Sequence, residues 1–171
     1  MRLKVRRSSP AQRHRARAIA LGERLMPANG SIDGFVVAVA AHRGRSVRVI
    51  SHLLDAAGPS GFWIGTSTGD YLVCSADATP TRRAAIVCHE LAHMLLGHEP
   101  EVGDTEALSL VSTVLAPDVD ASVAARFLTR HGYAGVAEED AEAAATAFVT
   151  TAANRQRAAI AIGNRVSERL R

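Results

Sequence analysis

Apolar and polar positions along the first half of the chain follow two periods, one typical of helices and one typical of strands. Residues 9–26 space Ala, Ile and Leu among arginines after Pro10, which predicts a helix that ends before 27–30. Ser31 is a suitable N-cap for a second helix, and Gly44 ends that helix. Short strands are predicted at three further places, 46–51, 62–66 and 71–75, the last two joined as a β-hairpin.

The later part of the chain keeps the helical period. Thr79 and Pro80 suit the cap and first position of a helix that runs to Gly97. Further helices are predicted at 104–115, at 121–131 and from about 136 into the C-terminal tail. These elements predict an α+β fold with a small three-stranded sheet and a predominantly helical second half.

The composition is that of a single globular domain. The 171 residues are 47% apolar and 22% charged, which is too hydrophobic for wholesale disorder. Aromatic residues make up only 4%, so the core is expected to consist of aliphatic side chains between closely packed helices. We divide the chain into a basic N-terminal arm at 1–30, a main domain at 31–160 and a helical tail at 161–171.

Other features of the sequence indicate where the protein resides. No stretch approaches the roughly 18 consecutive apolar residues of a membrane span, so no membrane association is expected. The basic N-terminus lacks the apolar segment of a secretory signal, and Cys74 and Cys88 are the only cysteines. We therefore expect a cytoplasmic protein with reduced thiols.

Charge is distributed unevenly along the chain. Residues 1–30 hold eight basic residues and one acid, whereas residues 84–125 hold seven acids and no Lys or Arg. The basic arm could bind nucleic acid, or it could pair with the acidic middle of the chain. An arginine-rich terminus without interleaved aromatic residues is more often a solvated end, and an arginine run by itself gives affinity without specificity.

The most informative residues lie in the helix predicted to end at Gly97. His89-Glu90-Leu91-Ala92-His93 is the His-Glu-x-x-His pattern of zinc peptidases. Residues four apart share one face of a helix, so both imidazoles can reach one Zn²⁺, while Glu90 can take a proton from a zinc-bound water. Such a site usually needs a third protein ligand.

An acid cluster at the start of the last helix can supply that ligand. It reads Glu138-Glu139-Asp140-Ala141-Glu142, and Glu138 and Glu142 share a helical face. One of these two acids would bind the metal and the other would orient a ligand histidine. The residues alone do not choose between them, and an acidic first turn also suits the helix dipole.

The segment His-Glu-Leu-Ala-His-Met-Leu-Leu-Gly-His at 89–98, together with 71–80 before it, resembles the ImmA/IrrE family of metallo-endopeptidases, particularly its short actinobacterial members. The resemblance spans roughly residues 31–155 and includes an E-x-x-A-x-x-x-A pattern on Glu138, Ala141 and Ala145. It implies a zincin-like fold with His89, His93 and Glu138 as zinc ligands, one ion per chain, and Glu90 as general base. Glu142 would then be a partner of a ligand histidine, or the third ligand itself if the helix is rotated.

The same resemblance implies a function inside the cell. Members of the family cleave regulatory proteins, often a helix-turn-helix repressor, and thereby release stress or mobile-element genes. An edge strand commonly aligns the substrate in such sites, and 71–75 is the candidate here, with Tyr71 and Val73 as its substrate-facing residues.

Two alternatives accompany this interpretation. The protein could bind zinc without cleaving anything, as a regulator or toxin-antitoxin-type partner, or it could bind nucleic acid through the basic arm. A His/His/Glu site also accepts Mn²⁺ or Fe²⁺. His98 follows the helix end at Gly97 and is expected to point away from the motif.

Overall fold

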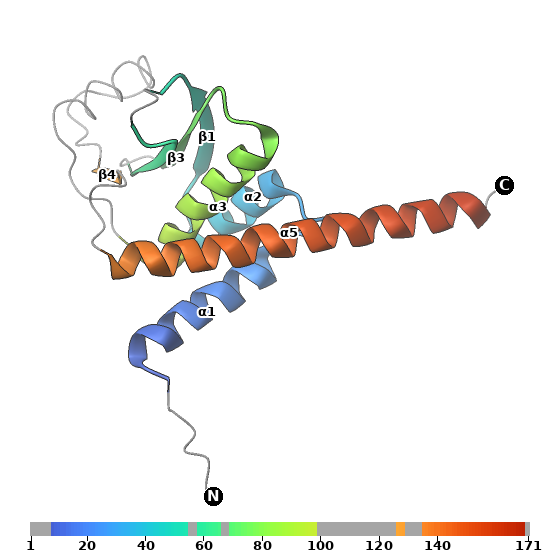
Figure 1. Ribbon diagram of the computed structural model, residues 1–171, viewed down its shortest axis with the longest axis horizontal. Helices are drawn as coiled ribbons and strands as arrows, with labels where there is room; N and C mark the ends of the chain where they lie inside the picture. The colour runs from blue at the N-terminus through green and yellow to red at the C-terminus, as the bar shows by residue number, and fades with distance from the viewer. Residues whose placement is uncertain (1–7, 55–57, 66–68, 99–125, 129–134, 170–171) are drawn as a thin grey trace, which may run out of the picture.

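The computed structural model describes residues 8–54, 58–65, 69–98, 126–128 and 135–169, which form a mixed α+β fold. The elements in chain order are α1 (Pro10–Leu25), α2 (Ile32–Arg43), β1 (Val47–His52), β2 (Gly61–Gly65), β3 (Asp70–Ser75), α3 (Pro80–Leu95), β4 (Arg126–Leu128) and α5 (Val136–Arg169). Figure 1 shows α5 running across the molecule, with α1 on one side of it and α2, α3 and the sheet on the other. The predicted α+β class is therefore confirmed.

Local capping signals explain where the first three helices begin and end. The side-chain oxygens of Ser9, Ser31 and Thr79 each accept a hydrogen bond from a backbone N–H in the first turn. Gly44 ends α2 with a φ of 64°, a conformation that glycine adopts without a Cβ clash. Helices α1, α2 and α3 thus lie where the sequence predicted them.

The described strands form one sheet in the order β1-β3-β2-β4. Strand β1 runs parallel to β3, whereas β2 is antiparallel to both β3 and β4. The three predicted strands are confirmed, and β4 adds a fourth strand beside β2, so the sheet is not limited to three strands.

Strand β4 also corrects a predicted helix. Residues 126–128 pair with β2, so the helix predicted at 121–131 is wrong over these residues. Pairing with a strand distant in the sequence outweighs their local helical preference. The helix predicted at 104–115 lies outside the described residues.

Strand β3 lies inside the sheet rather than at its edge. Its backbone pairs with β1 on one side and with β2 on the other. The expectation of a free edge at 71–75 is therefore wrong, because β1, more than twenty residues earlier, covers the side on which a peptide could have added. Tyr71 and Val73 are buried, at 7% and 0% exposure, and this strand has no open side on which they could receive a substrate strand.

Helix α3 occupies the centre of the packing. It contacts β2 and β3 on one side and α5 on the other, and α1 packs against α5. Phe35 of α2 and Phe148 of α5 meet edge to face, with ring centroids 5.3 Å apart. A Cβ at Gly22 would lie 2.2 Å from Cε1 of Phe148, so this glycine allows α1 to approach α5. The remaining core is mostly aliphatic, as the low aromatic content predicts.

An ion-pair network around the buried Asp70 holds the C-terminal end of α3. Asp70 is 2% exposed and pairs with Arg43 at 3.1 Å and with Arg45 at 3.4 Å. Arg43 also donates to the backbone oxygen of Met94 at 3.2 Å and lies over the ring of Trp63. A cation at the last turn of a helix is favoured by the helix dipole, so Arg43 ties α3 to the sheet.

The second part of α5 extends away from the other elements (Figure 1). Among the side chains of α5 that the structure describes, Ala152 is the last buried one, and Ile160 and Ile162 are 64% and 57% exposed. Within the described residues, no helix is both long enough and apolar enough to cross a membrane.

Candidate metal centre

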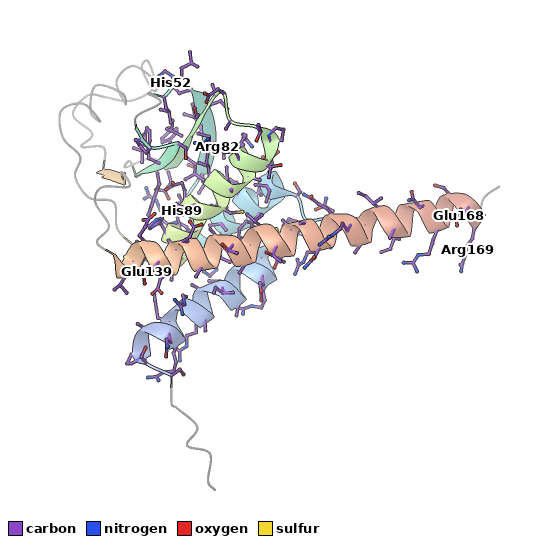
Figure 2. All side chains as sticks on the ribbon, viewed as in Figure 1. His52, Arg82, His89, Glu139, Glu168 and Arg169 are labelled. Carbon is purple, nitrogen blue, oxygen red and sulfur yellow. The ribbon has the colours of Figure 1, made fainter. Side chains whose placement is uncertain are left out.

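Helix α3 carries the two motif histidines inside the molecule. His89 and His93 are 5% and 2% exposed, and the separation of one helical turn brings their rings together. Their Nε2 atoms lie 3.0 Å apart, and the two ring planes meet at 66°. Figure 2 shows His89 on α3, close to the first turns of α5.

Glu138, in the first turn of α5, brings a carboxylate to both rings. Its Oε1 lies 3.1 Å from Nε2 of His89, and its Oε2 lies 3.4 Å from Nε2 of His93. Ligand atoms at about 2.0–2.1 Å from a tetrahedral ion are about 3.3 Å from one another, close to these separations. The three side chains can therefore hold a metal ion.

Two details of this group fit a cation. Oε2 of Glu138 is buried and has no hydrogen-bond partner among the described residues, which is costly for a carboxylate oxygen. The two Nε2 atoms also face each other at 3.0 Å, so that in the tautomers with Nδ1 protonated both lone pairs are available to one ion. A single cation between the rings and the carboxylate would satisfy all three groups.

The surroundings keep His93 in the form that binds metals. Burial, together with His89 and His98, lowers the pKa of His93 to about 3. The ring is therefore neutral at ordinary pH and retains a lone pair for a metal.

The side chains of the acid cluster on α5 point toward two different helices, because successive helical residues are about 100° apart around the axis. Glu138 and Glu142 face α3, and Oε2 of Glu142 lies 3.3 Å from Nδ1 of His89. Asp140 faces α1 instead and pairs with Arg15 at 2.9 Å. Glu142 thus contacts the ring nitrogen of His89 that is remote from Glu138, and Glu138 is the acid grouped with the two Nε2 atoms.

Glu90 is buried on α3, at 5% exposure. Burial raises the pKa of the Cys74 thiol to about 11, while Arg83 lowers that pKa and Glu90 raises it by smaller amounts. Glu90 does not belong to the group of three that can hold the metal. Cys88, next to His89, is fully buried, and burial raises the pKa of its thiol to about 12.

His98 contradicts the expectation that it points away from the motif. Its Nδ1 lies 2.9 Å from Nδ1 of His93, and the ring centroids are 5.1 Å apart. The pKa of His98 is lowered, mainly by burial and also by His14. Asp140 and Glu138 act in the opposite direction without reversing the shift. The signal that sequence reasoning missed is Gly97, whose left-handed conformation turns the chain back over the last turn of α3.

The basic arm is described from residue 8 onward, so its first four basic residues, within 1–7, lie outside the described structure. Arg15 of α1 is engaged with Asp140, and His14 Nε2 lies 2.9 Å from the backbone oxygen of Leu96. Helix α1 therefore contacts the end of α3 and the beginning of α5, the two helix ends nearest the metal centre.

A cavity of about 420 Å³ borders His89 between α3 and α5. Its walls are formed by Ser60, Arg82, Ala85, Ile86, His89, Glu142, Ala145, Thr146, Val149 and Thr150. It gives solvent a route to the ring of His89.

Comparisons of the chain with family models, curated proteins and solved structures found no match.

Proposed function

We propose that the protein is a zinc-dependent endopeptidase with a zincin-like domain, of the kind found in the ImmA/IrrE family. The observation that carries the proposal is the meeting of His89 Nε2, His93 Nε2 and the Glu138 carboxylate, with buried Glu90 directly after the first histidine. Two imidazoles, one carboxylate and an adjacent glutamate are the ligand set and general base of zinc peptidases.

Zinc, when bound, supplies a Lewis acid that polarises a peptide carbonyl and acidifies water. His89 and His93 would hold it through their Nε2 atoms, and Glu138 would complete the protein ligands. Glu142 would accept the Nδ1–H of His89 and thereby keep the other nitrogen free for the metal.

Glu90 would act as the general base. Its carboxylate would take a proton from the attacking water and pass it to the nitrogen of the departing amine. The proposed substrate is a regulatory protein such as a helix-turn-helix repressor, which follows from the family resemblance alone.

Metal content tests the first half of the proposal. The full chain is loaded with Zn²⁺ and desalted, and its mass is measured by native mass spectrometry. The variants His93→Ala and Glu138→Gln, and the exposed control Glu139→Gln, are measured in the same way. We expect one zinc per chain in the wild type and in Glu139→Gln, and loss of zinc in the other two. A wild type that takes up no zinc would overturn the proposal.

Peptide cleavage tests the second half. Zinc-loaded wild type is incubated with a complex peptide mixture, and new termini are identified by mass spectrometry. Glu90→Gln should retain zinc and lose activity by about 10²–10⁴-fold, because only the proton acceptor is removed. Equal cleavage by Glu90→Gln would exclude the proposed base, and zinc binding without any cleavage would favour a non-catalytic zinc regulator.

A further inference from the structure

We infer that His98 is a positioning residue for the metal ligand His93, acting through a hydrogen bond between their Nδ1 atoms. The inference rests on the proposed metal centre. It goes beyond that site because His98 is neither a ligand nor part of the His-Glu-x-x-His motif.

The backbone after α3 brings the two rings together. Leu96 is the C-cap, and Gly97 follows with a φ of 68°. The N–H of His98 donates to the backbone oxygen of His93 at 3.0 Å, and the N–H of Gly97 donates to that of Met94 at 3.2 Å. These two hydrogen bonds define a Schellman motif.

A Schellman motif places one particular pair of side chains in contact. The residue after the glycine lies against the residue three positions before the C-cap, and both are usually apolar. At the end of α3 these two positions hold His98 and His93. The usual apolar contact is therefore replaced by two imidazole rings whose Nδ1 atoms lie 2.9 Å apart.

The protonation of His93 fixes the direction of the hydrogen bond. A neutral imidazole that offers the Nε2 lone pair to a metal carries its proton on Nδ1. That Nδ1–H points at Nδ1 of His98, which must then be the acceptor. His98 thus holds the His93 ring in one orientation and one tautomer, as carboxylates and carbonyls do behind many metal-binding histidines.

Two substitutions at 98 separate positioning from packing. His98→Leu retains the apolar contact of a Schellman motif and removes the acceptor. His98→Asn places Oδ1 near the position of the ring Nδ1 and retains an acceptor. His42→Asn, at an exposed position on α2, is the matched control.

The readout is the dissociation constant for Co²⁺, measured by its visible absorption in competition with a chelator, on the full chain. We expect His98→Leu to bind about 10–100-fold more weakly, and His98→Asn and His42→Asn to bind as the wild type does. Equal affinity of the Leu variant and the wild type overturns the inference while leaving the proposed function intact. Failure of the wild type to bind Co²⁺ and Zn²⁺ overturns both.

A second measurement needs no variant. In the ¹⁵N-labelled, zinc-loaded protein, a scalar coupling between the Nδ1 nuclei of His93 and His98 is expected across the N–H···N bond. A His93 Nδ1–H without this coupling would show that the two rings only pack together.

Discussion

The two halves of α5 differ in how much of their side-chain surface is buried. The first half carries Glu138 and buries a row of small or aromatic side chains against α1, α2 and α3. In the second half, beyond Ala152, none of the described side chains is buried. The first half of this continuous helix thus forms part of the core and carries Glu138, whereas its second half is exposed to solvent. Burial, rather than helical propensity, decides what each half contributes to stability.

The largest effect is expected at Phe148, the fully buried ring of the first half. Phe148→Ala should lower the free energy of unfolding by about 3–5 kcal/mol, because it leaves a cavity between α2 and α5. Urea denaturation of the metal-free protein measures this, with Phe148→Leu as a graded variant that loses less. A loss below about 1 kcal/mol would mean that the two aromatic rings are not packed as described.

A smaller loss is expected where α1 approaches the first half of α5. Gly22→Ala places a methyl group 2.2 Å from the Phe148 ring and should cost about 1–3 kcal/mol through displaced side chains. The control is Gly163→Ala in the second half, where a Cβ meets nothing within 4 Å and alanine favours the helix. In thermal unfolding, Gly22→Ala should lower the melting temperature and Gly163→Ala should raise it. Changes of the same sign in the two variants would contradict the described packing.

The junction of α3 with the first half of α5 should make stability depend on pH. The pKa of His93 is lowered from 6.5 to about 3 in the folded protein. As the pH falls, His93 therefore binds a proton in the unfolded chain at a higher pH than in the folded protein. As pH falls below about 6.5, unfolding of the metal-free protein should become easier by up to about 1.4 kcal/mol per pH unit. This contribution is complete above pH 6.5 and is lost progressively down to the folded pKa. His93→Asn should show a shallower dependence in urea titrations between pH 4 and 7, and equal slopes would contradict the assignment.

The smallest effect is expected in the second half of α5. Replacing Ile160 and Ile162, both exposed, by Lys should change the free energy of unfolding by less than about 0.5 kcal/mol. Urea denaturation at several protein concentrations checks this. A larger, concentration-dependent loss would indicate that a second copy covers these residues.

Local signals in the sequence predicted the parts of the fold that depend on neighbours along the chain. Ser31 and Gly44 fix α2, Thr79 fixes the start of α3, and helical periodicity placed His89 and His93 on one face. Each of these features is determined within a few residues, so a single sequence suffices to find it.

Features that depend on distant pairing could not be found in this way. Nothing near 71–75 reveals that β1 lies parallel beside β3, and the three residues of β4 are a strand only because β2 is next to them. Periodicity likewise placed Glu138 and Glu142 on a shared face, and the packing of α5 on α3 assigned them to different nitrogens of His89. The orientation of His98, in contrast, depends on a local signal, because Gly97 both ends α3 and turns the chain back over its last turn.

The length of α5 affects how the protein moves through solution. Its 34 residues span about 51 Å at 1.5 Å per residue. A compact chain of 171 residues has a radius of gyration of about 16 Å, equivalent to a sphere about 40 Å across. A rod that protrudes beyond such a sphere increases hydrodynamic friction, so a monomer of 18.1 kDa will elute early from a sizing column and tumble slowly. Sedimentation equilibrium, which reports mass independently of shape, is therefore the appropriate measure of its oligomeric state.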